Sequence, residues 1–289
     1  MRKFIALLCL CLLLLGCSDP TRYTSLSVPM TTESIARGRT LFIGLGHCGF
    51  CHGEKGTPDS PPSGGRIFSD VYGDVAAPNL TPSETGLKRW TARDIMKVFR
   101  EGTARKGRTL SNQVHVGAEW ISDSDLIALV SYLRALPPVE KEVAARSLGF
   151  VERNTTGFFE GTKEVEGYVP TVNPKHAAEY GRYLTDHVAR CGSCHSSPAS
   201  LITSADYLAG GRIIKNDQGE KTAPGITNSE TVGIGGWSES QIINYLKTGA
   251  RPDNTKVDSN FCPVSFFKNA PDSDLQAIAR YLKSDTEGR

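Results

Sequence analysis

The stretch Cys48-Gly49-Phe50-Cys51-His52 recurs 143 residues later as Cys191-Gly192-Ser193-Cys194-His195. In a C-x-x-C-H sequence, the two thiols can join the vinyl groups of a haem as thioethers, and the adjacent imidazole can become the proximal iron ligand. Each copy therefore predicts a covalently attached c-type haem, which gives two haems for the chain. The alternative is a single zinc ion bound by all four cysteines, which would leave both histidines without a role.

The residues around the two motifs repeat as well. Each motif is followed by Gly-Gly-Arg-Ile, by an Ala-Pro-x-x-Thr run and by a tryptophan. Trp90 precedes Gly102 by 12 residues, and Trp237 precedes Gly249 by the same number, which indicates a duplication. Periodicity and capping residues predict helices over residues 34–45, 92–100, 122–136, 177–188, 239–247 and 272–283.

The repeat sets the expected domain boundaries. A first domain is predicted over residues 34–138 and a second over 175–289, and each has the size of an ordinary small domain. Residues 139–174 interrupt the repeat and lack steady periodicity, and they include Gly157, Gly161, Gly167, Pro170 and Pro174. We interpret them as a connector that runs over the surface; an additional strand or helix packed on one domain is the open alternative.

The N-terminus has the pattern of an export signal. Met1-Arg2-Lys3 is followed by an apolar run and then by Leu14-Leu15-Gly16-Cys17, which resembles a bacterial lipobox. This pattern predicts a signal peptide over 1–16, lipidation of Cys17, and a flexible tether over 17–33 rich in Ser, Thr and Pro. The chain would then be anchored at the periplasmic side of a bacterial membrane, with Ser18 slightly favouring the outer membrane. An ordinary signal peptide with an incidental Cys17 is the alternative.

The charge balance argues against binding to nucleic acid. Without Arg2 and Lys3, 31 basic residues face 31 acidic ones in the mature chain. A formally neutral protein lacks the basic excess that binds phosphate backbones, so membrane attachment is expected through the lipid alone.

With these motifs the chain resembles the dihaem class I cytochromes c, especially the cytochrome subunits that accept electrons from membrane-associated bacterial dehydrogenases. The resemblance rests on both C-x-x-C-H motifs, the Gly-Gly-Arg and Ala-Pro-x-x-Thr runs, the tryptophan elements, and the final-helix patterns at Asp125 to Leu133 and Asp274 to Leu282. It implies an all-α fold of two tandem domains, each wrapped around one haem. It also implies electron transfer from a dehydrogenase to a cytochrome or oxidase.

The sixth iron ligands depart from the usual pattern of that family, which is a methionine before the last helix. No methionine follows Met96, whereas His115 and Cys262 each lie 25 residues after the tryptophan of their half. We hypothesise His52/His115 ligation for haem 1 and His195/Cys262 ligation for haem 2. The alternatives left open are Met96 as the haem 1 ligand, His115 at the surface beside an open iron, an inert buried Cys262, and Lys256 as a ligand. The other histidines, His47, His176 and His187, are interpreted as solvated or in contact with haem propionates.

The sequence leaves three functional classes to compare. If both irons are six-coordinate, no site is open to a substrate, and an electron carrier is favoured over a stand-alone enzyme. The competing class is a haem enzyme of sulfur-compound oxidation similar to the dihaem thiosulfate dehydrogenases, in which Cys262 would leave the iron and bind a sulfur oxyanion. A sensor or peroxidase would require a five-coordinate haem.

Overall fold

The computed structural model describes residues 27–70, 72–104, 108–109, 115–150, 165, 167–197 and 206–284. The predicted signal peptide, Cys17 and most of the predicted tether lie outside these residues. Within them, no helix combines the length and the apolar character that crossing a membrane requires.

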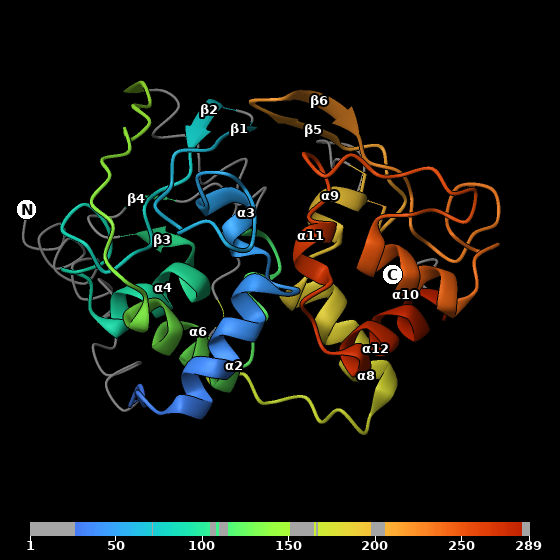
Figure 1. The fold of residues 1–289 in the computed structure, drawn as a ribbon, viewed down its shortest axis with the longest axis horizontal. Coiled ribbons are helices and arrows are strands. Elements are labelled where there is room, and N and C mark those ends of the chain that lie inside the picture. The colour runs from blue at the N-terminus through green and yellow to red at the C-terminus, as the bar shows by residue number, and fades with distance from the viewer. Residues whose placement is uncertain are drawn as a thin grey trace, which may run out of the picture.

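Both halves share a helix, the C-x-x-C-H turn, a β-hairpin, a second helix and a final helix, in that order, and they differ between the last two helices (Figure 1). The first half contains α2 (Thr32–Ile43), α3 (Cys48–His52), β1 (Ile67–Asp70), β2 (Gly73–Ala76), α4 (Ala92–Glu101), β3 (Thr103–Ala104), β4 (Arg108–Thr109), the 3-10 helix η2 (Ala118–Trp120) and α6 (Asp123–Ala135). The second half contains α8 (Ala177–Tyr183), the π-helix η3 (Leu184–Val188), α9 (Gly192–His195), β5 (Ile213–Asn216), β6 (Gly219–Thr222), α10 (Glu239–Thr248), α11 (Val264–Phe267) and α12 (Asp272–Lys283).

In each half, the first and last helices cross in close contact at a glycine. A Cβ atom at Gly38 of α2 would lie 1.9 Å from the carbonyl oxygen of Ala128 in α6. A Cβ atom at Gly181 of α8 would lie 2.3 Å from the carbonyl oxygen of Ala277 in α12. Both distances are far inside van der Waals contact, so only glycine allows these helix pairs to approach so closely.

This close approach predicts a large stability difference between two glycine substitutions. Gly181→Ala is expected to lower the free energy of unfolding by about 1–3 kcal/mol, because the added methyl group must push α8 away from α12. The control is Gly236→Ala, since a Cβ atom at Gly236 meets nothing within 4 Å. Urea unfolding of the two purified variants measures the difference, and equal stabilities would contradict the packing described here.

The helices α4 and α10 show why the sequence repeats at these points. Each begins with a capping box, formed by Thr91 with Asp94 in α4 and by Ser238 with Gln241 in α10. Each ends at a glycine in the left-handed conformation, Gly102 with φ 60° and Gly249 with φ 71°. The 12-residue spacing from tryptophan to glycine is therefore the length of one capped helix and its lead-in turn.

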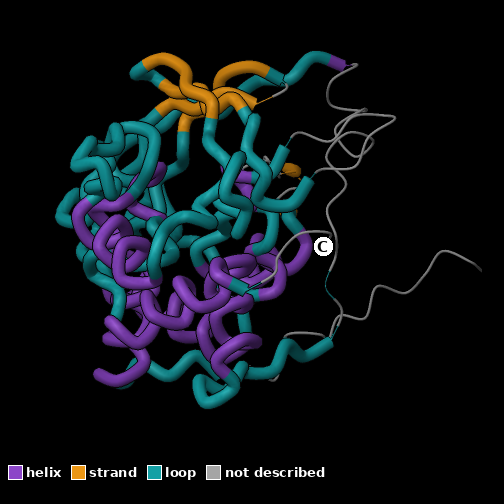
Figure 2. Tube along the Cα trace, turned by 90° about the vertical axis from the view of Figure 1, so that its right-hand side faces the viewer, coloured by secondary structure: helices purple, strands orange, loops and turns teal. Residues whose placement is uncertain are grey.

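The prediction of an all-α fold is wrong in one respect, because the two halves share a four-stranded sheet in the order β2-β1-β5-β6. Figure 1 and Figure 2 show this sheet on one side of the molecule, with the main helices on the other. Each half contributes one antiparallel hairpin, and the hairpins pair through β1 and β5 in the register Phe68↔Asn216. The strands are four residues long. β1 has one buried residue and β6 is fully exposed, so these two strands lack the alternation that marks a half-buried strand.

The larger of two apolar clusters runs through both halves. It contains Leu126 and Val130 of α6 together with Leu184 of η3 and Leu275 of α12. Because these side chains come from both halves of the repeat, the halves bury surface against each other as well as within themselves.

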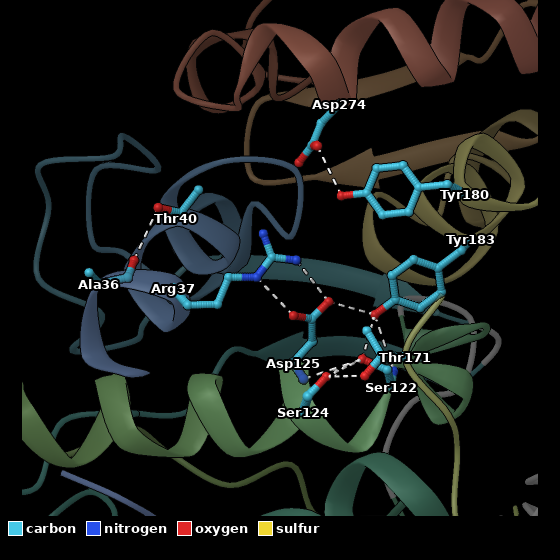
Figure 3. A network of polar contacts seen from close by, with 10 residues as sticks. All are labelled: Ala36, Arg37, Thr40, Ser122, Ser124, Asp125, Thr171, Tyr180, Tyr183 and Asp274. Atoms are coloured by element: carbon cyan, nitrogen blue, oxygen red, sulfur yellow. Dashed lines mark hydrogen bonds and ion pairs between the residues drawn. The ribbon is translucent and has the colours of Figure 1, made fainter. Parts of the chain in front are cut away.

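Polar contacts also join the halves, as Figure 3 shows. The Arg37 guanidinium donates two hydrogen bonds to Asp125, of 2.8 and 3.0 Å. Asp125 also accepts a 2.8 Å hydrogen bond from the Tyr183 hydroxyl of the second half. Nearby, the Tyr180 hydroxyl donates to Asp274 at 2.9 Å. Both buried carboxylates are thus hydrogen-bonded, and Asp125 is also ion-paired, which offsets the cost of burying a charge.

The described part of the predicted connector lies against the first half. The Val139 carbonyl accepts a 2.8 Å hydrogen bond from the Asn79 side chain, and Glu140 accepts from the backbone of residues 84 and 85. Further along, Val165 is buried and its amide donates to the Arg100 carbonyl at 3.1 Å. These contacts hold both ends of the segment onto the first half.

Candidate haem-binding sites

Each C-x-x-C-H stretch forms a short helical turn, α3 in the first half and α9 in the second. The residue before each first cysteine has a left-handed backbone, with φ 37° at His47 and φ 52° at Arg190. Residues three and four positions apart lie on the same face of a helix. Cys48, Cys51 and His52 are therefore presented together, as covalent attachment and proximal ligation require.

The histidine of each C-x-x-C-H motif is oriented by a proline carbonyl. His52 Nδ1 lies 2.9 Å from the Pro78 oxygen, and His195 Nδ1 lies 2.8 Å from the Pro224 oxygen. A carbonyl can only accept, so Nδ1 carries the proton and Nε2 keeps the lone pair that binds a metal. Burial lowers the pKa of both imidazoles, which favours the neutral, metal-binding form.

The repeated glycines hold these prolines in place. The Gly64 amide donates to the His52 carbonyl at 2.7 Å, and the Gly65 amide donates to the Ala77 carbonyl at 2.9 Å. The same two bonds occur in the second half, from Gly210 to His195 at 2.5 Å and from Gly211 to Ala223 at 2.9 Å. The sequence alone indicates the Gly-Gly-Arg and Ala-Pro-x-x-Thr runs only as markers of the repeat. Through these bonds they position the prolines against the motif histidines, and their recurrence in the same order after each C-x-x-C-H motif is the sequence signal for this contact.

His115, the predicted distal ligand of haem 1, lies near His52. Their ring centroids are 6.4 Å apart. A metal–imidazole bond is about 2 Å long, so two imidazoles on opposite sides of one iron have centroids roughly 6 Å apart. The residues present therefore fit an iron between these two rings.

Cys262, the predicted distal ligand of haem 2, lies in the loop between α10 and α11. Its thiol accepts a hydrogen bond from the Tyr245 hydroxyl, with 3.9 Å between oxygen and sulfur, and it interacts electrostatically with the Cys194 thiol. Burial raises the pKa of the Cys262 thiol to about 11. The Cys262 thiol thus lies within electrostatic reach of the second C-x-x-C-H motif, and a metal bound to it would deprotonate the thiol.

Two arginines that the sequence pattern did not single out lie next to the motifs. Arg66 is buried, donates to the Phe50 carbonyl at 2.6 Å and pairs with Asp217 at 3.6 Å. Arg212 is its counterpart in the second half; burial raises the pKa of the Cys194 thiol, and the nearby Arg212 charge partly opposes that rise. Among the described residues, the buried Nε of Arg212 has no hydrogen-bond partner. A buried Nε–H group without a partner beside the second motif fits the carboxylate of a haem propionate.

The structure also bears on the alternative metal site, on Met96 and on the remaining histidines. The described residues contain no group of three His, Cys, Asp or Glu side chains able to hold a metal ion, so the four cysteines do not gather into a zinc site. Met96 of α4 is 1% exposed and belongs to the apolar core. His176 is exposed, whereas His47 and His187 are half-buried: His47 packs edge-on against Phe267, and His187 bonds to a backbone carbonyl.

Comparison with known proteins agrees with this geometry. The cytochrome c family model matches residues 35–137. The chain is 31% identical over 280 residues to the fructose dehydrogenase cytochrome subunit of Gluconobacter japonicus, covering 92% of this chain and 55% of that protein. A diheme cytochrome c-type protein of Cereibacter sphaeroides is 28% identical, with 92% of this chain and 89% of that protein covered. The gluconate 2-dehydrogenase cytochrome c subunit of Pantoea cypripedii is 26% identical, with 91% of this chain and 62% of that protein covered.

Residues 35–137 are therefore a cytochrome c domain, and such a domain implies covalently bound haem c. The chain as a whole is a homologue of cytochrome c subunits of dehydrogenases and of a diheme cytochrome c. It spans 55% of the length of the fructose dehydrogenase cytochrome subunit and 62% of the gluconate 2-dehydrogenase subunit.

Proposed function

We propose that the protein is an electron-transfer cytochrome with two tandem class I cytochrome c domains and two covalent haems. Cys48 and Cys51 would attach haem 1, and Cys191 and Cys194 would attach haem 2. When bound, each haem supplies one-electron iron redox chemistry. The observation that carries the proposal is that both C-x-x-C-H turns present an imidazole whose Nδ1 proton is held by a proline carbonyl.

For the sixth ligands we propose His115 at haem 1 and Cys262 at haem 2. The 6.4 Å separation of the His52 and His115 rings supports the first assignment. The closeness of the Cys262 thiol to Cys194 supports the second. The hydrogen bond from Tyr245 would stabilise a negatively charged sulfur at that position. Filling both positions with protein side chains leaves no coordination site for a substrate, which favours a carrier.

The partners follow by analogy with the relatives. Cytochrome c subunits of fructose dehydrogenase, gluconate 2-dehydrogenase and alcohol dehydrogenase (quinone) are similar to this chain over most of its length. We propose that a dehydrogenase is the electron donor and that a cytochrome or oxidase is the acceptor. The lipobox pattern supports an anchor at Cys17 on the periplasmic side of a bacterial membrane.

A haem count and a turnover assay together test the proposed function. The pyridine haemochrome spectrum of the purified protein is expected to give two haems c per chain, and both should be reducible by dithionite and reoxidisable. With thiosulfate and an artificial acceptor, no turnover is expected, because neither iron offers an open site. One haem per chain would refute the dihaem assignment. Thiosulfate oxidation that is lost in Cys262→Ala would favour the sulfur-oxidising enzyme instead.

A further inference from the structure

The loop that carries His115 is held by the second half of the chain. Gly117, two residues beyond His115, has a left-handed backbone with φ 94°. Its amide donates a 2.8 Å hydrogen bond to the Glu119 side chain. A Cβ atom at Gly117 would lie 2.3 Å from the Asp186 carbonyl oxygen and 3.7 Å from the Arg190 side chain. The loop therefore lies directly against residues 186–190, which lead into the second haem motif.

One side chain connects the two segments. His187 Nδ1 lies 3.0 Å from the Gly117 carbonyl oxygen, and the bond is partly buried. The carbonyl accepts, so the imidazole donates its Nδ1 proton. Burial lowers the pKa of His187, so the ring is neutral, and a neutral ring with its proton on Nδ1 can make this bond without carrying charge.

The donor side chain differs between the two halves. By the spacing of the repeat, the counterpart of His187 in the first half is Gly44, which has no side chain to donate such a bond. Among the described residues, the first half instead contacts the segment after Cys262 through the Ile43 carbonyl, which accepts a 3.1 Å hydrogen bond from the Asn269 side chain. The imidazole donor at the haem 1 loop is therefore not supplied by the shared fold alone.

We propose that His187 is a positioning residue for the sixth ligand of haem 1. By fixing Gly117, it holds the loop so that His115 stays opposite His52. The inference rests on the proposed ligation of haem 1 by His115. Through this bond, the segment that leads into the second haem motif contributes to the coordination of the first.

A matched pair of substitutions tests this role. The amide nitrogen of asparagine can take the place of Nδ1, so His187→Asn is expected to keep the bond. His187→Gln keeps an amide but extends it by one carbon, beyond the position of Nδ1. The readout is the rate of carbon monoxide binding to the ferrous protein, because carbon monoxide binds only when a sixth ligand leaves. Loss of one partly buried hydrogen bond should increase that rate roughly threefold to tenfold in His187→Gln. His187→Asn and the exposed control His176→Asn should stay within about twofold of the wild type.

A further variant separates this inference from the proposed function. His115→Ala is expected to open haem 1, giving fast carbon monoxide binding and a high-spin signal in the electron paramagnetic resonance (EPR) spectrum. If His115→Ala changes neither, the proposed ligation fails. If His115→Ala opens the haem but His187→Gln binds carbon monoxide like the wild type, the positioning role alone is refuted. Should His187→Gln fail to incorporate haem, Gly117→Ala replaces it, since the added methyl group would force the loop away from Asp186 and should accelerate binding similarly.

Discussion

The double variant Cys191→Ala/Cys194→Ala is expected to carry one covalent haem instead of two. Without these thiols the second motif cannot form thioethers, although His195 and its bond to Pro224 remain. The pyridine haemochrome spectrum of denatured, washed protein should fall to half of its wild-type haem content per chain. The reciprocal variant, Cys48→Ala/Cys51→Ala, should lose the other haem.

Stability should also fall in these variants. The apolar core is continuous between the halves, so removing a large apolar body from one site weakens packing in both. We expect the midpoint of thermal unfolding to drop by on the order of 10 °C, since about 1 kcal/mol corresponds to roughly 2–4 °C in a chain of this size. Cys262→Ser serves as the control, because that thiol is not predicted to attach haem and its loss should leave both haems bound. An unchanged haem count in both double variants would refute covalent attachment at these motifs.

The second large effect is expected from Cys262→Met. A thiolate stabilises ferric iron more than a thioether does, so the reduction potential of haem 2 should rise by on the order of 0.2 V. A spectroelectrochemical titration resolves this shift. The low-spin EPR signal of narrow g-spread that is typical of thiolate ligation should disappear from the oxidised protein.

Two comparisons sharpen this prediction. Haem 1 should keep its potential, because Cys262 lies in the loop of the second half. Tyr245→Phe keeps the sulfur but removes its 3.9 Å hydrogen bond. It should shift the haem 2 potential in the opposite direction and by less, because an unbonded thiolate donates more strongly to iron. If Cys262→Met leaves both the potential and the EPR spectrum unchanged, Cys262 does not ligate the iron.

Much of the helical structure could be predicted from the sequence because the signals are local. The expected helix over residues 272–283 has the bounds of α12, and the helix over 92–100 is one residue shorter than α4. The helix expected over 177–188 has the right extent, but its last five residues form a π-helix. Side-chain periodicity does not distinguish the two forms over so few residues.

The shared sheet and the His187 bond depend on contacts between residues far apart in the chain, which local patterns do not predict. The shared sheet was missed because its strands are short and mostly exposed, so their pairing follows from the approach of two hairpins far apart in the chain. The bond from His187 to Gly117 spans 70 residues and leaves no mark on the local pattern. By contrast, His115 could be singled out because its spacing from Trp90 repeats in the second half. Internal repetition supplied the long-range information that periodicity lacks.

The pairing of β1 with β5 gives the chain the internal geometry of a symmetric dimer. Phe68 pairs with Asn216, whose counterpart in the first half is Asp70, and two equivalent strands that pair antiparallel in this way are related by a local two-fold axis. Each half covers the open edge of the other. Half of the chain expressed alone would expose β1 or β5 as an unpaired strand and would bind a second copy through it.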